Sequence, residues 1–161
     1  MQGRFRANIE VLAQHDVNYS VVGGVGAVIQ GCPITTFDLE IVHLRSDENV
    51  RRLLGALDEL GAVYGFQPER RLRPTVEALA GTGHHLLQTV HGPLDVLGEI
   101  GSGHGYDELI GQSESFLAGE SLTVNVLNLD WLIRTKEEAG APKDIAVLEL
   151  LREVRRQRGS G

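Results

Sequence analysis

The sequence has little of the features that would assign its class at once. Cys32 is its only cysteine, so no disulfide can form within the chain. No apolar run approaches the roughly 20 residues that span a bilayer, and the segment Met1 to Arg6 lacks the apolar core of a signal peptide. These absences exclude a disulfide-stabilised scaffold and a membrane-spanning helix, and we expect a cytoplasmic protein.

Positive charge is also scarce. The chain carries 15 Lys and Arg residues against 22 Asp and Glu residues, for a formal net charge of -7. Proteins that coat DNA or RNA are usually basic, so a long nucleic acid is a poor candidate partner. Arginines still form two local clusters, which we interpret as solvated surface, with contact to a phosphate-bearing or acidic partner as the alternative. The clusters are Arg70, Arg71 and Arg73, and Arg152, Arg155, Arg156 and Arg158.

Apolar residues, in contrast, are sufficient for a core. The 161 residues are 42 % hydrophobic, which is typical of a globular domain. We expect a single domain over residues 1–161, with its core at about 8–127 and a pair of C-terminal helices at about 128–157.

Hydrophobic periodicity predicts the order of the elements. Helical spacing predicts helices over residues 4–14, 25–30, 47–60, 129–139 and 143–156, and shorter apolar or alternating runs predict strands over 16–22, 37–44, 62–66, 85–90, 94–97 and 122–127. We expect a loop with one helical turn over 67–82, and burial of Ile145, Leu148 and Leu151 in the last helix. This order predicts a small mixed β-sheet covered by helices, of the α+β or α/β class.

Two acidic residues near a glycine turn form the first candidate site. Gly23 and Gly24 join the first predicted strand to a short helix, and Asp38 and Glu40 open the next strand. Because residues i and i+2 of a strand face the same side, both carboxylates point together while the alternate residues point into the core. Paired carboxylates near a helix start suit a divalent metal ion and a phosphate.

A third acidic residue, Asp95, lies in a later predicted strand between apolar neighbours. An acid in such a strand is costly to bury unless a cation or a hydrogen-bond donor satisfies it. Three carboxylates would hold two metal ions, the arrangement that clamps the attacking and leaving oxygens in phosphoryl transfer. The sequence therefore predicts that Asp38, Glu40 and Asp95 meet in one site.

Taken in order, these residues resemble the nucleotidyltransferase superfamily of the DNA polymerase β type. That family's pattern is a strand, a Gly-Gly or Gly-Ser turn, a short helix, a glycine, an Arg-x-Thr-x-Asp-x-Asp segment and a third acid on a later strand. The resemblance covers about residues 8–152 and points to small bacterial branches that include antibiotic nucleotidyltransferases and AbiEii-like toxin-associated proteins. The matching residues are Gly23, Gly24, Ala27, Gly31, Thr36, Asp38, Glu40, Asp95, Lys136, Lys143 and Asp144.

The resemblance implies an activity and a set of roles. The chain would move a nucleotidyl group from a nucleoside triphosphate to a hydroxyl of a small-molecule or protein acceptor, with Mg²⁺ or Mn²⁺. The acids would be both catalytic and metal-binding, and Asp95 would also serve as base for the acceptor hydroxyl. The implied nucleotide-binding residues are Gly23, Gly24, Thr36, Lys136 and Lys143, and the implied metal ligands are Asp38, Glu40 and Asp95.

Two positions depart from the family pattern. Glu40 stands where the family has Asp, and its side chain is one methylene longer; Ile34 stands where the family often has Arg. These departures favour an alternative, a catalytically degenerate nucleotidyltransferase-like module used for binding, for instance as one partner of a toxin–antitoxin pair. A homodimer is an open alternative to a monomer, because a second copy would complete an acceptor pocket.

Other classes receive less support from the sequence. A dinucleotide-binding turn at Gly24 and Gly26 fails because Ile29 occupies the third glycine position. The histidines lack the spacing of a zinc site, and we interpret them as loop or surface residues. A small oligomeric ligand-binding domain unrelated to nucleotides remains open, and it would leave the three carboxylates far apart. The histidines in question are His84, His85, His91 and His104.

Overall fold

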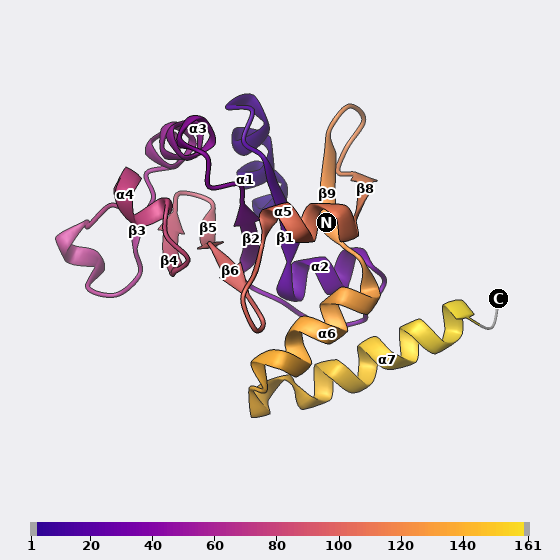
Figure 1. Ribbon diagram of the computed structural model, residues 1–161. Helices are drawn as coiled ribbons and strands as arrows, with labels where there is room; N and C mark the ends of the chain where they lie inside the picture. The colour runs from indigo at the N-terminus through magenta and orange to yellow at the C-terminus, as the bar shows by residue number, and fades with distance from the viewer. Residues whose placement is uncertain (1–2, 160–161) are drawn as a thin grey trace.

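The computed structural model describes residues 3–159, in which a sheet of seven strands has helices on both faces (Figure 1). The strand order is β3-β4-β5-β2-β1-β9-β8. The pairs β2–β5 and β1–β9 are parallel and the others are antiparallel, so the sheet is mixed as expected. The strands are β1 (Tyr19–Val22), β2 (Leu39–His43), β3 (Val63–Tyr64), β4 (His84–Thr89), β5 (Gly92–Leu97), β8 (Ser113–Leu117) and β9 (Thr123–Leu127).

The helices follow the predicted order closely. They are α1 (Gly3–Gln14), α2 (Gly23–Ile29), α3 (Asp47–Glu59), α4 (Val76–Leu79), α5 (Tyr106–Leu109), α6 (Leu129–Ala139) and α7 (Ile145–Gly159). A two-stranded hairpin, β6 (Glu99–Ile100) and β7 (His104–Gly105), precedes α5. No helix within residues 3–159 is long and apolar enough to cross a bilayer.

Side-chain caps fix the starts of two helices. The Ser46 hydroxyl accepts a hydrogen bond from the Asn49 N–H at 3.2 Å, and the Asn128 side chain accepts one from the Trp131 N–H at 2.9 Å. Such caps satisfy backbone donors that have no partner within the helix. The predicted starts of α3 and α6 are confirmed.

The two faces of the sheet carry separate apolar clusters. Leu39 and Ile41 of β2 face α1 and α3, together with Leu94 and Val96 of β5. Val42, two residues beyond Glu40, belongs to a second cluster with α5 and α6. Figure 1 shows α1 and α3 on one side of the sheet and α6 on the other. Alternate residues of β2 and β5 therefore point either toward α1 and α3 or toward α6.

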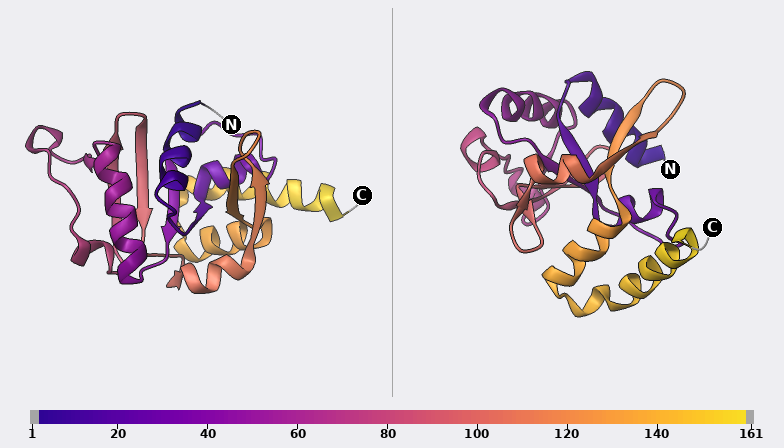
Figure 2. Two further views of the ribbon diagram at one scale, coloured as in Figure 1. Left: turned by 90° about the horizontal axis from the view of Figure 1, so that it is seen from above. Right: turned by 45° about the vertical axis from the view of Figure 1, so that its right-hand side comes forward.

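The last two helices form a pair that docks on α2. Figure 2 shows α6 and α7 side by side, with the end of α7 near the segment that follows α2. The Arg158 side chain donates to the side chain of Gln30 at 2.9 Å and also to its backbone carbonyl. A third apolar cluster joins these helices to α2, and its buried members are Ala27, Cys32, Leu129, Ile133, Leu148 and Leu151.

The structure corrects several sequence predictions. Ile145 is 60 % exposed rather than buried, because it is the first residue of α7 and lies at the edge of the helical pair. The segment 67–82 has a 3-10 turn over residues 68–70 as well as α4, where one helical turn was expected. The sequence did not predict β8 at all. Its side chains are mostly exposed, so it has no apolar signature and is held by its ladder with β9.

Much of the second arginine cluster contacts other parts of the same chain. Arg152 pairs with Glu137 and Arg155 pairs with Asp130, each with an N–O separation of 3.5 Å. Exposed pairs of this kind contribute little stability. The contacts agree with the interpretation of these arginines as surface residues that support the helical pair.

Candidate functional site

Glu40 and Asp95 are direct partners in the parallel ladder of β2 and β5. Both are half-buried, and in each strand the flanking residues point to the opposite face, into the cluster with α1 and α3. Cross-strand partners in register project from the same face of a sheet. The two carboxylates therefore lie on the face that α6 partly covers. Asp38, two residues before Glu40, just precedes β2 and lines the same cleft.

A cleft of about 340 Å³ opens at these acids. Its walls come from β2, β4 and β5, the start of α2, the β6–β7 hairpin, α6 and the 3-10 turn over Pro142–Asp144 that precedes α7. All three predicted acids line it, and so do both predicted lysines. The charged residues of its lining are Asp38, Glu40, Asp95, Lys136, Lys143 and Asp144, with His84 as a further titratable group.

Gly23 explains how Glu40 reaches the start of α2. Gly23 has a backbone φ of +63°, which residues with a side chain rarely adopt. A Cβ atom at this position would lie 2.5 Å from Oε2 of Glu40. The glycine therefore leaves the space that the longer Glu40 side chain occupies, next to the first residue of the helix.

Gly24 and Thr36, which the resemblance implied as nucleotide-binding residues, do not line the cleft. A Cβ atom on Gly24 would stand 2.4 Å from Oγ1 of Thr36, so the two residues are in close contact. Thr36 lines a separate apolar cavity of about 370 Å³ together with Ile34 and residues of α1, α2 and β8. Gly24 brings the segment before β2 close to α2, and in this way positions Asp38 and Glu40.

Glu40 and Asp95 hold protons more tightly than isolated carboxylates do. Burial, together with the nearby charges of Glu40 and Asp38, raises the pKa of Asp95 to about 7. Burial also raises the pKa of Glu40, against the opposing effect of Lys136. A cluster of acids with raised pKa values in a cleft is typical of a functional site, because the fold keeps charges together that repel one another.

The two predicted lysines have different surroundings. The Lys136 ammonium contacts Asp144 with an N–O separation of 3.5 Å, and its charge lowers the pKa of Glu40. Lys143 lowers the pKa of both Glu40 and Asp95. The structure therefore brings both lysines to the acids. It also adds Asp144, which the resemblance had marked only as part of a Lys-Asp pair.

The side chains of Asp38, Glu40 and Asp95 are not arranged around a common metal position. Among residues 3–159, no group of three or more His, Cys, Asp or Glu side chains is arranged so that it could hold a metal ion. The donor set itself suits Mg²⁺ or Mn²⁺, because Asp38, Glu40 and Asp95 offer only carboxylate oxygens. The raised pKa of Asp95 also marks a place where a cation would relieve repulsion. The residues present fit such an ion, provided that their side chains turn toward it.

The interpretation of the four histidines as loop or surface residues is wrong for His85. His85 is buried, and its Nδ1 shares a hydrogen bond with the Tyr64 hydroxyl at 2.8 Å. His84 lines the cleft, and its Nε2 lies 2.7 Å from the Glu99 carbonyl oxygen, as in an N–H···O bond. Exposed and buried residues alternate along β4, so His84 and His85 point to opposite faces of the sheet. The strand predicted from the sequence begins at residue 85 and therefore does not include His84.

The wall formed by the β6–β7 hairpin was not foreseen. Its tip contributes Ile100 and Gly101 to the cleft. His104 holds the hairpin to neighbouring helices, because its ring contacts Glu138 of α6 at 2.7 Å and Glu108 of α5 through its other nitrogen. Partial burial lowers the pKa of His104, but the two glutamates outweigh it and leave a net rise.

Comparison with known proteins bears on the fold. No protein-family model matches the chain, and no curated protein matches it in sequence. The structure is similar to the crystal structure of TM1012, a protein from Thermotoga maritima provisionally described as a nucleotidyltransferase. The TM-score is 0.59 at 16 % sequence identity, over 95 % of this chain and 91 % of that one. At this identity the likeness is one of fold.

The fold is thus of the nucleotidyltransferase-like class, with a mixed sheet and two C-terminal helices. This confirms the fold that the sequence predicted. The register of β2 and β5 also brings the acids together, which argues against the domain with widely separated carboxylates.

Proposed function

We propose that this protein is a metal-dependent nucleotidyltransferase that moves a nucleotidyl group from a nucleoside triphosphate to a hydroxyl of a small-molecule or protein acceptor. One observation carries the proposal. Glu40 and Asp95 are neighbours in the β2–β5 ladder and face a cleft that also holds Lys136 and Lys143. Carboxylates for metal ions beside cations for phosphates are the groups that such a transfer requires.

The chain's own residues supply positioning and charge. Lys136 and Lys143 would bind the triphosphate, beside Gly23 and the Glu40 carboxylate for which that glycine leaves room. The acceptor oxygen forms a bond to the α-phosphorus, the bond from that phosphorus to the bridging oxygen breaks, and pyrophosphate leaves. A carboxylate oxygen of Asp95 would accept the acceptor's proton, which suits a group whose pKa is near 7.

Asp38, Glu40 and Asp95 are the residues that would hold Mg²⁺ or Mn²⁺. When bound, the metal would neutralise charge on the phosphates. The protein must keep the three carboxylates close together. The pairing of β2 with β5 places Glu40 beside Asp95, and Gly23 leaves room for the Glu40 side chain.

A second candidate function is binding without catalysis, as in a partner of a toxin–antitoxin pair. The observation that favours it is the absence, within residues 3–159, of a group arranged to hold a metal ion. Ile34 agrees with it, because it packs toward the helical pair and lines the apolar cavity beside α1 instead of the cleft. In this case nucleotide binding would not depend on a divalent ion.

Isothermal titration calorimetry with ATP, CTP, GTP and UTP, with and without Mg²⁺, separates the two functions. The proposed enzyme should bind at least one nucleotide roughly tenfold or more tightly with Mg²⁺, an effect worth about 1.4 kcal/mol. Asp38→Asn and Asp95→Asn should each remove that dependence. The matched control is Glu69→Gln, which alters an exposed carboxylate outside the cleft.

Two results would sink the proposal. One is equal binding of all four nucleotides by the wild type and both Asp variants. The other is the absence of pyrophosphate release when the protein is incubated with the bound nucleotide, Mg²⁺ and a panel of hydroxyl acceptors. Mg²⁺-independent binding alone would favour the non-catalytic module. A cytoplasmic location and a homodimer belong to the same proposal, and fractionation and sedimentation test them.

A further inference from the structure

A second groove adjoins the cleft on the side of β3 and β4. It has a volume of about 490 Å³, and it shares Asp38, His84, Leu86 and Asp95 with the cleft. The two hollows therefore meet at the same carboxylates. A molecule in the groove would reach these acids from a hollow that neither Lys136 nor Lys143 lines.

The floor of the groove is the uncovered face of β4. His84, Leu86 and Gln88 point outward along this strand, whereas His85 and Leu87 are buried. Leu86 is 58 % exposed, and its strand partner is Asp95. On β1 and β2 the same face is covered by α6, through the cluster that contains Leu132. An apolar side chain therefore stays open to water next to the acids.

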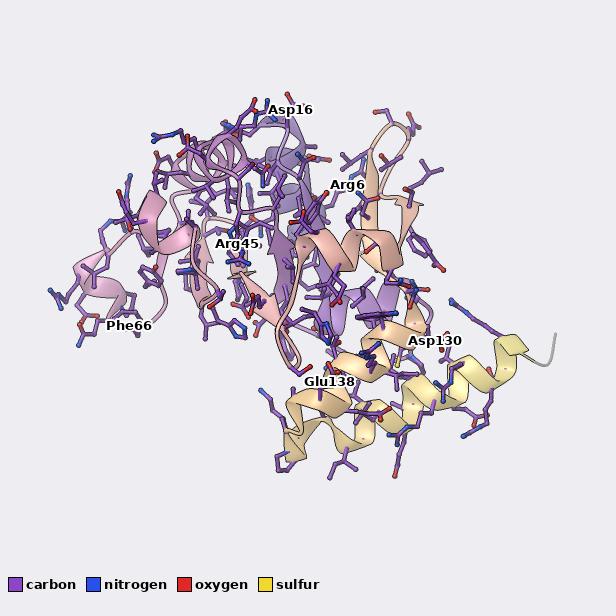
Figure 3. The ribbon with its side chains drawn as sticks, viewed as in Figure 1. Arg6, Asp16, Arg45, Phe66, Asp130 and Glu138 are labelled. Atoms are coloured by element: carbon purple, nitrogen blue, oxygen red, sulfur yellow. The ribbon has the colours of Figure 1, made fainter. Side chains whose placement is uncertain are left out.

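An aromatic side chain lies at the outer wall. Phe66, just after β3, is 61 % exposed and is labelled in Figure 3. Its ring lies 5.5 Å from that of Tyr64, whose hydroxyl is hydrogen-bonded to His85. The Gly65 N–H between them donates to the Leu86 carbonyl at 3.0 Å. These contacts hold the Phe66 segment close to β4.

Charge distinguishes the groove from the cleft. None of the described residues that line the groove is Lys or Arg, and Asp38 and Asp95 close its inner end. A triphosphate would be repelled there and attracted to Lys136 and Lys143 on the other side. A neutral or cationic molecule with an aromatic or apolar part fits both the open apolar side chains and the carboxylates.

We propose that this groove is the acceptor site, and that the acceptor is a neutral or cationic molecule carrying a ring or an apolar part beside its hydroxyl. The proposal rests on the proposed function, in which the nucleotide occupies the cleft. The acceptor's ring would lie against Phe66 and Leu86, and its hydroxyl would approach Asp95.

Nuclear magnetic resonance tests the groove with two small probes that differ in charge. Tyramine carries a phenol and an ammonium group, and 4-hydroxyphenylacetate carries the same ring with a carboxylate. Tyramine should shift the Gly65 amide and bind at least five times more tightly than 4-hydroxyphenylacetate. Phe66→Ala should weaken tyramine binding at least fivefold, and Leu117→Ala, at a 75 % exposed position on β8, should leave it unchanged.

A nucleotide analogue separates this inference from the proposed function. The analogue α,β-methylene-ATP with Mg²⁺ should shift the Gly23 and Gly101 amides, which border the cleft, and should leave tyramine bound. If the analogue fails to bind while tyramine still shifts Gly65, the proposed function fails, and the groove is shown to be a site without an acceptor role.

Other outcomes overturn the acceptor site itself. Competition between tyramine and the analogue would place both in one hollow. Equal affinity for the two probes, or full affinity in Phe66→Ala, would remove the basis in charge or in aromatic contact. If sedimentation shows a wild-type dimer that Phe66→Ala dissociates, the groove is an interface between copies.

Discussion

Glu40 on β2 and Asp95 on β5 stand directly opposite each other in a parallel ladder, on a face where Leu86 and Val22 continue the same row. Like charges at directly opposed positions destabilise a sheet. The fold therefore holds these two acids together at a cost to its own stability. Such a cost is reasonable where a bound cation removes it, and it can be measured in the metal-free protein.

Asp95→Asn should stabilise the metal-free protein at high pH. Asp95 has a pKa of about 7 in the folded state against 3.8 in a model peptide. Because the folded pKa of Asp95 is raised, the contribution of this group to the stability of the fold is fully present below about pH 4 and is lost as the pH rises through about 7. We expect the variant to exceed the wild type by on the order of 1 kcal/mol at pH 8, since solvent screens part of the shift.

Urea unfolding at pH 4 and pH 8 in the presence of a chelator measures this difference. Glu69→Gln, at an exposed carboxylate, should follow the wild type at both values. Adding Mg²⁺ at pH 8 should raise the stability of the wild type more than that of Asp95→Asn. A variant that gains nothing between pH 4 and pH 8 would show that Asp95 is not crowded by its neighbours.

Gly24→Ala should destabilise the protein by about 1–3 kcal/mol, the usual cost of overpacking. The new methyl group would stand 2.4 Å from the Thr36 hydroxyl oxygen, so one of the two segments must move. Gly26→Ala, two residues along α2, is the matched control because its nearest contacts are at 3.4 Å. Thermal unfolding compares the two, and an equal loss in both would mean that Gly24 is no special point of contact.

Leu151→Ala should cost about 2–5 kcal/mol, because this α7 side chain is fully buried against α2 and α6. Ile145→Ala removes a similar side chain at a 60 % exposed position of the same helix and should cost less than about 1 kcal/mol. Chemical unfolding of both variants measures the difference. Comparable losses would mean that α7 is not docked as the structure shows.

The sequence predicted the order of nearly all the elements, because periodicity and caps are local signals. The starts of α3 and α6, where the structure has caps at Ser46 and Asn128, are examples, and so is the burial of Leu148 and Leu151. What it missed depends on tertiary contacts. Edge strand β8 is held by its ladder with β9 and has no apolar pattern of its own.

The candidate site was predictable for a different reason. The i, i+2 rule places Asp38 and Glu40 on one face from spacing alone. Asp95 was a candidate because it is an acid between apolar neighbours, but its register opposite Glu40 is known only from the structure, since nothing local tells which strand pairs with β2. Phe66 and His104 could not be found, because their roles come from neighbours distant in sequence, namely β4 for the first and α6 for the second.

The link between His104 and Glu138 gives the last prediction. It joins the β6–β7 hairpin to α6, and Gly101 in that hairpin lines the cleft. The charged groups around the ring are Glu108 and Glu138, with Arg134 bound in turn to Glu138. Because the folded pKa of His104 is raised, the stabilising effect of this link is complete below about pH 6.5 and is lost as the pH rises through the folded value.

Glu138→Gln keeps the length of the side chain and removes its charge, so the pKa of His104 should fall. Glu137→Gln, at the adjacent position paired with Arg152, should leave it unchanged. Titration of the His104 ring signals by nuclear magnetic resonance measures both, and the Gly101 amide should shift over the same pH range as His104. An equal fall in both variants, or a Gly101 amide that does not follow His104, would show that the hairpin is held to α6 by other contacts. Agreement of the two titrations would mean that one wall of the cleft loosens as the pH rises through the folded pKa of His104.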